Sequence, residues 1–301
     1  MKIASRLEPL VGKTNPGVRR LIWRAGLKGS QGVGRLTAGF RVLPDYLIVG
    51  TQRGGTTTLQ KHLTQHRQVQ SARLLKGVHY FDMNYERGEG WYRSHFPLQV
   101  SRSWREGHVL AGEASPYYMF HPLGPYRIAS TLENVKLIVL LRDPKQRALS
   151  HHQHEVHRGF EHLSFEDALD AEEERLEGAV DRMLEQPSYV SFSHQHHSYK
   201  ARGRYHEQLA RIFEHSPRDR VLILESNDLF ERSASVYSRV LNFLEIEAFA
   251  LPAFEHLNPA PRPTKLKSAT LRLLDAYFEG PDQRLGQMLG SPPSWVTPSA
   301  P

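Results

Sequence analysis

The stretch YLIVGTQRGGTTT, residues 46–58, decides how the chain folds. Its apolar part belongs to a run over residues 45–50 that ends in glycine, which is typical of a buried β-strand. After the glycines, Leu59 and Leu63 lie four positions apart, and this spacing predicts a helix over residues 57–66. A buried strand that leads through a glycine-rich turn into a helix indicates an α/β domain.

The turn between this strand and this helix has the chemistry of an anion-binding site. Two glycines, Gly54 and Gly55, let successive backbone N–H groups point into one concavity. The helix that begins near Thr56 adds its N-terminal dipole and its free N–H groups. With one permanent positive charge and the hydroxyl groups, the candidate anion ligands are Arg53, Gly54, Gly55, Thr56, Thr57 and Thr58.

The same turn differs from the loop that binds ATP. That loop reads GxxxxGK[ST], with a lysine before the last hydroxyl residue. When the pattern is aligned on Gly50 and Gly55, the lysine position holds Thr56. The difference disfavours magnesium-assisted nucleotide hydrolysis. It also disfavours a kinase-like phosphoryl transferase, which is the nearest enzymatic alternative to the function considered below.

A second apolar run, KLIVLL at residues 136–141, predicts another buried strand. It leads into Arg142, and Ser150 follows eight positions later on an expected helix over residues 147–157. Ligands of open α/β sheets bind beyond the carboxyl ends of the strands. Since a guanidinium can meet phosphate oxygens in bidentate fashion, we expect Arg142 and Ser150 to bind a second phosphate of the same nucleotide.

The remaining sequence alternates between strand and helix patterns and contains no repeat of fixed period. Ser164, with Asp167 three residues on, has the spacing of a capping box. We expect one domain over residues 41–290, with a mainly parallel central sheet covered by helices on both faces. Residues 1–40 form a basic N-terminal arm and residues 291–301 a C-terminal tail in this interpretation. Further strands are expected at 109–111 and 221–224, and further helices at 164–176, 199–213, 236–244 and 266–278.

The net charge of +7 belongs to the arm, because residues 1–40 hold eight basic side chains and one acidic one. The neutral body argues against nucleic acid as a partner, since its binders carry a basic stripe on the folded domain. The arm lacks the apolar run of a membrane span and the cleavage site of a secretory signal. Residues 17–27 could form a short basic helix on an anionic membrane surface, and a loosely ordered arm is the alternative.

The chain has no cysteine, which excludes disulfides, thiolate metal sites and cysteine nucleophiles. This composition suits a reducing compartment. We therefore expect a cytoplasmic protein, with peripheral contact to the inner membrane face through the arm as an option.

The two motifs together resemble the sulfotransferases that use 3′-phosphoadenosine 5′-phosphosulfate as donor. They are GTQRGGTTTL at residues 50–59 and LLRDPKQRALSHHQHE at residues 140–155. The similarity extends over about residues 44–290 and is greatest to the bacterial and heparan-sulfate-like branch. Segments typical of that branch are KGVHYFD (76–82), GEASPYYMFHP (112–122) and HHSYKARGRYHEQL (196–209).

The resemblance implies a P-loop-like sulfotransferase fold and a role for each motif. The enzyme would move a sulfuryl group to a hydroxyl, or to an amine, of a carbohydrate, lipid or small-molecule acceptor. Residues 53–58 would bind the 5′-phosphosulfate, and Arg142 with Ser150 would bind the 3′-phosphate. Arg53 stands where relatives often have lysine, and its charge would stabilise the departing phosphate.

The general base is the open question. Relatives usually have glutamate at the position of Gly77, and glycine cannot take a proton. His79 is the nearest replacement, because an imidazole with an ordinary pKa of about 6.5 suits proton abstraction near neutrality. Glu113 is the second candidate, since burial can raise the pKa of a carboxyl group. Asp82 could orient His79 only if the chain curls, because in a straight strand the two would face opposite sides.

Ala114 is a second departure, because relatives that act on glycosaminoglycans commonly carry lysine there. With Gly77 it argues against a heparan-like acceptor. The alternative from another class is therefore a non-catalytic anion- or polysaccharide-binding protein that retains the nucleotide fold.

Histidines gather within residues 151–157 and 194–197, but no further converging ligands and no HExxH pattern accompany them. We therefore expect no metal. Instead, His151 and His152 should flank Ser150 near the nucleotide. The second cluster should line the acceptor cleft or cap the helix that begins at Tyr199.

Overall fold

The centre of the computed structural model is a five-stranded sheet in the order β2-β3-β1-β4-β5. Every pairing is parallel, so all the strands end at one edge. The predicted parallel α/β sheet is thus confirmed, and KLIVLL is a strand with the predicted bounds. The strands are β1 (Tyr46–Gly50), β2 (Val69–Ser71), β3 (Leu110–Ala114), β4 (Lys136–Leu141) and β5 (Val221–Glu225).

The structure describes residues 34–72, 77–103, 109–251, 254 and 266–296. Most of the predicted arm, including the basic helix expected over residues 17–27, lies outside these ranges. Among the described residues, no helix combines the length and the apolar character needed to cross a membrane.

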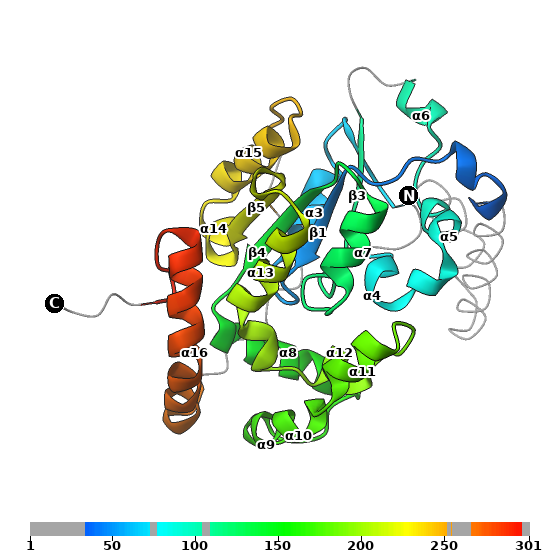
Figure 1. Ribbon diagram of the computed structural model, residues 1–301. Helices are drawn as coiled ribbons and strands as arrows, with labels where there is room; N and C mark the ends of the chain where they lie inside the picture. The colour runs from blue at the N-terminus through cyan, green and yellow to red at the C-terminus, as the bar shows by residue number, and fades with distance from the viewer. Residues whose placement is uncertain (1–33, 73–76, 104–108, 252–253, 255–265, 297–301) are drawn as a thin grey trace, which may run out of the picture.

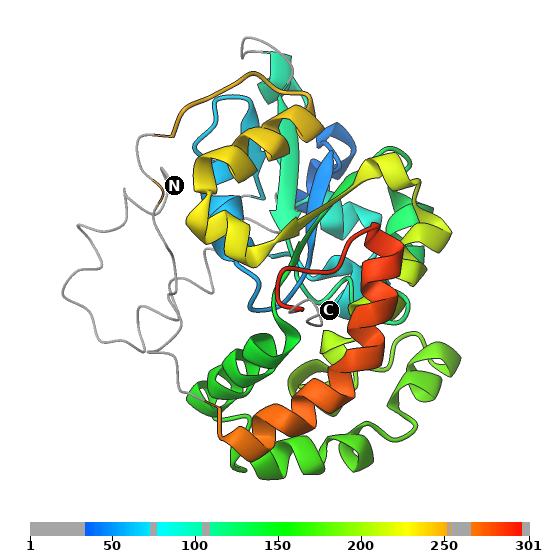
Figure 2. The ribbon, with the colours of Figure 1, turned by 90° about the vertical axis from the view of Figure 1, so that its left-hand side faces the viewer.

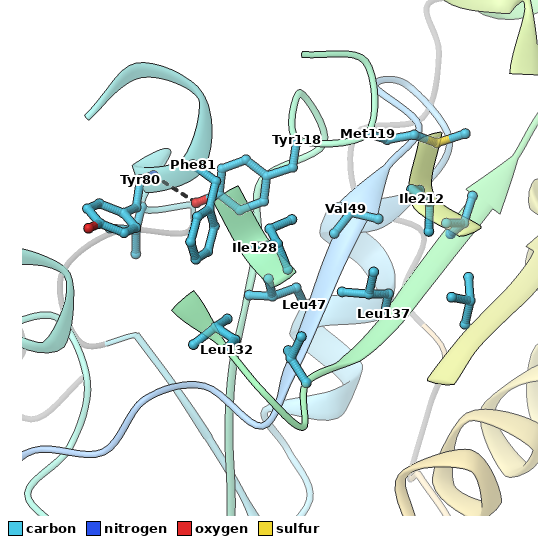
Figure 3. Packing of buried hydrophobic residues seen from close by; sticks show 14 of the residues in the cluster. Leu47, Val49, Tyr80, Phe81, Tyr118, Met119, Ile128, Leu132, Leu137 and Ile212 are labelled. Atoms are coloured by element: carbon cyan, nitrogen blue, oxygen red, sulfur yellow. Dashed lines mark hydrogen bonds between the residues drawn. The ribbon is translucent and has the colours of Figure 1, made fainter. Parts of the chain in front are cut away.

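Helices cover both faces of the sheet because successive strand residues point to opposite sides (Figure 1). On one face, Leu47 and Val49 pack against α7 (Gly124–Thr131) and α13 (Tyr205–His215). Figure 3 shows this packing, in which Leu137 of β4 and Ile128 of α7 also take part. On the other face, strand residues pack against α3 (Thr56–Leu63), α14 (Ser226–Glu231) and α15 (Ser233–Leu244).

A third apolar group lies beyond the edge where the strands end. It joins α8 (Pro144–Arg158) and α9 (Phe165–Asp170) to α16 (Ser268–Leu289). Figure 2 shows α16 running from this group up to the sheet. The remaining helices are α4 (Tyr80–Met83), α5 (Glu89–Arg93), α6 (Val100–Ser103), α10 (Glu172–Leu176), α11 (Ala179–Glu185) and α12 (Phe192–His196), with 3₁₀ turns Ala38–Phe40, Tyr85–Arg87, Ala201–Gly203 and Arg218–Arg220.

Some predicted boundaries were wrong, and tertiary contacts explain one of them. The helix expected over 199–213 begins at Tyr205, because the buried carboxylate of Glu172 accepts bonds from the backbone N–H groups of Lys200 (2.6 Å) and Ala201 (2.8 Å) and holds a 3₁₀ turn there. The Ser164 cap is confirmed, although the helix behind it breaks at Ala171.

Close contact between β1 and β3 makes Gly112 a test of this packing. A Cβ atom at Gly112 would lie 2.3 Å from the ring of Tyr46, which is fully buried. We expect Gly112→Ala to lower the free energy of unfolding by about 1–3 kcal/mol, the usual cost of overpacking, as measured by chemical denaturation. Gly39→Ala is the matched control, because nothing lies within 4 Å of its Cβ position. Equal losses in the two variants would contradict the packing described.

Candidate functional site

The turn after β1 is held against β4 by backbone contacts. The N–H of Thr51 donates to the carbonyl of Leu140 at 3.0 Å, and the N–H of Gly54 donates to the carbonyl of Thr51 at 2.9 Å. A Cβ atom at Gly54 would lie 2.6 Å from the same Leu140 carbonyl, so only glycine fits. Gly55 has φ +93°, a left-handed conformation that glycine adopts without strain, and α3 begins directly after it. The predicted glycine-rich turn therefore ends at a helix N-terminus, where anions bind.

The two predicted phosphate-binding elements meet through Arg53. Its Nε donates to Oγ of Ser150 at 3.0 Å, across 97 positions of the chain. A guanidinium nitrogen of Arg142 donates to the carbonyl oxygen of Arg53 at 2.9 Å. Burial lowers the pKa of Arg53, and the nearby charge of Arg142 lowers it further. The charge of Glu155 opposes this shift, and two partly buried like charges at one place favour the binding of an anionic ligand.

Two residues that the sequence interpretation missed support this arrangement from neighbouring elements. Ser226 donates from Oγ to the carbonyl of Gly54 at 2.8 Å, and Tyr205 donates from its hydroxyl to the carbonyl of Arg142 at 2.7 Å. Ser226 directly follows β5, so the rule that ligands bind at strand ends could have found it. Tyr205 lies on α13 and gives no such signal.

A cavity of about 1120 Å³ opens over the turn. Its wall contains His79 and Arg142, whereas Ser150 and Glu113 are buried outside it. From the predicted donor set, the wall includes Arg53, Gly55, Thr56, Thr57, Thr58 and Arg142.

His79 is turned into the cavity by a sharp bend of the backbone. It has φ +53°, and α4 begins with the next residue. The bend is the curl that allows Asp82 to reach it, and Nδ1 of His79 lies 2.8 Å from Oδ2 of Asp82. The His79 side chain is 37% exposed and that of Asp82 is fully buried, so a carboxylate inside the protein fixes a ring that faces the cavity.

Glu113 lies at the centre of a hydrogen-bond network. Its carboxylate accepts bonds from the N–H of Val78 (2.6 Å), Oγ of Ser115 (2.7 Å) and the hydroxyls of Tyr92 (3.0 Å) and Tyr118 (2.7 Å). Burial raises the pKa of Glu113, and the bonds from Val78 and Ser115 oppose that rise. Each oxygen of this fully buried carboxylate thus accepts two hydrogen bonds from protein groups.

The two departures from the resembled family lie next to each other. A Cβ atom at Gly77 would lie 2.5 Å from the carbonyl of Ala114 and 2.8 Å from Oγ of Ser115. A glutamate therefore cannot stand at position 77 on this backbone without a shift of the chain. Both residues line the cavity beside His79.

Of the second histidine cluster, expected to line an acceptor cleft or cap a helix at Tyr199, one member lines the cavity. His196 lies in its wall, and its Nδ1 is 3.0 Å from the buried carboxylate of Glu155. Another wall residue, Tyr117, makes a 2.7 Å contact between its hydroxyl and Nδ1 of His194. Within the described ranges, no group of three or more His, Cys, Asp or Glu residues is arranged to hold a metal ion.

The first histidine cluster differs in part from the expectation. His151 and His152 are buried with their rings against Tyr199 and do not line the cavity. His154, one turn after Ser150 on α8, is the member that does.

Comparison with known proteins gives the family. The model of the sulfotransferase domain matches residues 43–257. Among curated relatives, the chain is 36% identical over 137 residues, 42% of its length, to the membrane-associated sulfotransferase kil1 of Dictyostelium discoideum. It is 28% identical over 217 residues, 70% of its length, to heparan sulfate glucosamine 3-O-sulfotransferase 3A1 of Mus musculus. The matches span 28% and 48% of those two proteins, so this chain corresponds to a part of each.

A solved structure shows the same fold. The sulfotransferase from Alicyclobacillus acidocaldarius superimposes with a TM-score of 0.65 at 24% identity, over 84% of this chain and 98% of that one. The domain match extends from just before β1 to beyond α15 and includes both sequence motifs, residues 50–59 and 140–155. The chain therefore belongs to the sulfotransferase domain family.

Proposed function

We propose that this chain transfers a sulfuryl group from 3′-phosphoadenosine 5′-phosphosulfate to a hydroxyl group of a glycan. The observation that carries the proposal is the meeting of Arg53, Ser150 and Arg142 at the glycine-rich turn. Family membership supports sulfuryl transfer. The relatives named as heparan sulfate sulfotransferases support a glycan acceptor.

The donor site follows from the positions of the charges. The N–H groups at the start of α3, with Arg53 and the threonines 56–58, would hold the 5′-phosphosulfate. Arg142, with Ser150 nearby on α8, would hold the 3′-phosphate, because the planar guanidinium can donate two parallel hydrogen bonds to phosphate oxygens. These proposed ligands are arginine, glycine, threonine and serine residues, and none of them is a carboxylate or an imidazole.

We assign the proton transfer to His79. Its Nδ1 faces the Asp82 carboxylate, so in the neutral ring that nitrogen carries the proton and Nε2 carries the lone pair that can accept one. The acceptor oxygen attacks sulfur as Nε2 takes the hydroxyl proton, and the bond from sulfur to the phosphate oxygen breaks. The electron pair of that bond stays on the phosphate, where Arg53 and the turn N–H groups stabilise the charge.

Glu113 acts as a positioning residue in this proposal. Ser115, which donates to Glu113, accepts a bond at its Oγ from the N–H of His79 at 3.1 Å. The carboxylate thus orders the chain beneath the imidazole. It lies outside the cavity wall, which argues against Glu113 as the base.

Membrane contact through residues 1–40 and a cytoplasmic location stay predictions. The relative named as a membrane-associated sulfotransferase supports the first. The residues that would make the contact lie mainly outside the described ranges.

Removal of the Arg142 side chain should weaken donor binding through the 3′-phosphate. We expect Arg142→Ala to reduce the affinity for adenosine 3′,5′-bisphosphate about ten- to a hundredfold in calorimetry, the usual effect of losing charged hydrogen bonds. Affinity for adenosine 5′-phosphosulfate, which lacks the 3′-phosphate, should change little. Arg232→Ala is the control, because Arg232 is exposed and pairs with Asp228. Equal losses for both nucleotides would contradict the assignment.

Removal of the His79 imidazole should stop proton transfer without loss of donor binding. We expect His79→Ala to lower kcat about 10²- to 10⁴-fold, with the affinity for the bisphosphate nucleotide retained. Transfer is measured with radiolabelled donor and a panel of glycans, and His157→Ala, at an exposed position of α8, is the control. An unchanged kcat in His79→Ala would remove the base assignment. A wild-type chain that binds donor without any transfer would favour the non-catalytic alternative.

The position of Gly77 gives a further prediction. Restoring the glutamate common in relatives should not increase activity, because its Cβ atom would meet the Ala114 carbonyl. We expect Gly77→Glu to lower the Tm and to leave kcat at or below that of the wild type. A higher kcat with an unchanged Tm would show that this carboxylate can be accommodated as a base.

A further inference from the structure

The segment after α16 returns to the cavity and forms part of its wall. Figure 2 shows it leaving the upper end of α16 and turning beneath β5 toward the middle of the molecule. Ser294 fastens it to the end of β5, where its N–H donates to Oε1 of Glu225 at 3.1 Å and its hydroxyl donates to Oε2. Ser294 and Trp295 both line the cavity.

Trp295 is held in a defined orientation. Its Nε1 donates to Oδ2 of Asp282 on α16 at 2.9 Å. The ring of Tyr205 meets it edge to face, with the centroids 6.1 Å apart. Since the hydroxyl of Tyr205 donates to the carbonyl of Arg142, the indole is linked through one residue to the arginine assigned to the 3′-phosphate. An anchored indole in a cavity wall is a ready surface for a flat aromatic group.

The sheet order places Trp295 on the side of the turn away from the proposed base. His79 is bonded to Ser115, which follows β3, whereas the segment with Trp295 is bonded to the end of β5. With β1 and β4 between them, β3 and β5 are three strand spacings apart, about 14 Å. The sulfuryl end of the donor must face His79, so its nucleoside must extend toward β4 and β5.

The β5 side of the cavity also has an apolar side chain that an uncharged base could contact. Phe230 of α14 lines the cavity there, and its ring is 3.3 Å from the Cβ position of Gly55. Arg53 and Arg142 lie at the turn and after β4, where they would face the phosphates, and the carboxylate of Glu225 on the β5 side is bonded to Ser294. An uncharged base beyond them would gain most from aromatic surfaces.

We propose that Trp295 stacks on the heterocyclic base of the donor nucleotide, so that the segment 291–296 is part of the donor site. The proposal rests on the proposed function, since it takes the donor to be a nucleoside 3′,5′-bisphosphate derivative. The segment predicted from sequence as a tail thus becomes a binding element.

The test compares two ligands that differ only in the base. They are adenosine 3′,5′-bisphosphate and the same ribose bisphosphate with hydrogen in place of adenine. In calorimetry, Trp295→Ala should weaken the nucleotide about five- to a hundredfold, the range for removal of a stacked aromatic, and leave the abasic ligand unchanged. Trp295→Phe should lose less, because it keeps a smaller ring. Arg142→Ala should weaken both ligands.

Fluorescence gives a readout that does not depend on the folding of the alanine variant. Bound nucleotide should quench tryptophan emission in the wild type and in Trp91→Phe, whose site lies in the core near Tyr80. The quenching should be lost in Trp295→Phe at saturating nucleotide.

Two results would overturn the stacking proposal alone. One is that the wild type binds the nucleotide and Trp295→Ala binds it with the same affinity. The other is an equal loss for the nucleotide and the abasic ligand, which would show that the segment acts by placing Arg142. A wild-type chain that binds neither ligand would instead overturn the proposed function, and this inference with it.

Discussion

Parallel pairing of β1 with β4 is the constraint on which the site depends. Because the two strands run side by side in the same direction, the turn after Gly50 and the residues after Leu141 emerge at one edge of the sheet. Arg53 and Arg142, 89 positions apart, are thereby brought into direct contact. Burial and the nearby charge of Arg142 lower the pKa of Arg53, so the two neighbouring cations favour an anionic ligand. Bonds from Ser226 and Tyr205 to the carbonyls of Gly54 and Arg142 hold the two segments in place.

The sequence was sufficient for the parts of the site that are local. The run 136–141 predicts β4 with its observed bounds, because six residues with Ile and Val between polar flanks suit the length and composition of a buried strand better than those of a helix. The glycine-rich turn likewise predicts an anion-binding loop at a helix N-terminus from its own residues. β2 was missed because three residues are too few to show alternation. The helix expected over 266–278 continues to Leu289, through Pro281, where the pattern suggested an end.

The other residues of the site depend on contacts between distant segments. His79 and Asp82 face each other only because the backbone curls at φ +53°, which a single sequence does not reveal. Trp295 reaches the cavity only because α16 runs from the lower helices up to the sheet and a serine fastens the returning chain to β5 (Figure 2). The spacing of residues carries no signal for either arrangement, since both result from packing that involves segments far along the chain.

The buried carboxylate of Glu113 joins the segment that carries His79 to the end of β3. A carboxylate taken out of water is costly unless donors surround it, and here four groups donate to it. Two of those donors also fix the backbone at His79: Val78 precedes it, and Oγ of Ser115 accepts a bond from its N–H. Gly77 passes so close to Ala114 that it leaves no room for a side chain. The missing glutamate and the inward histidine are therefore consequences of one tight crossing between the chain at 77–79 and the end of β3. In the proposal the base lies two positions further along, where the left-handed backbone of His79 carries its imidazole into the cavity while its N–H stays bonded to Ser115.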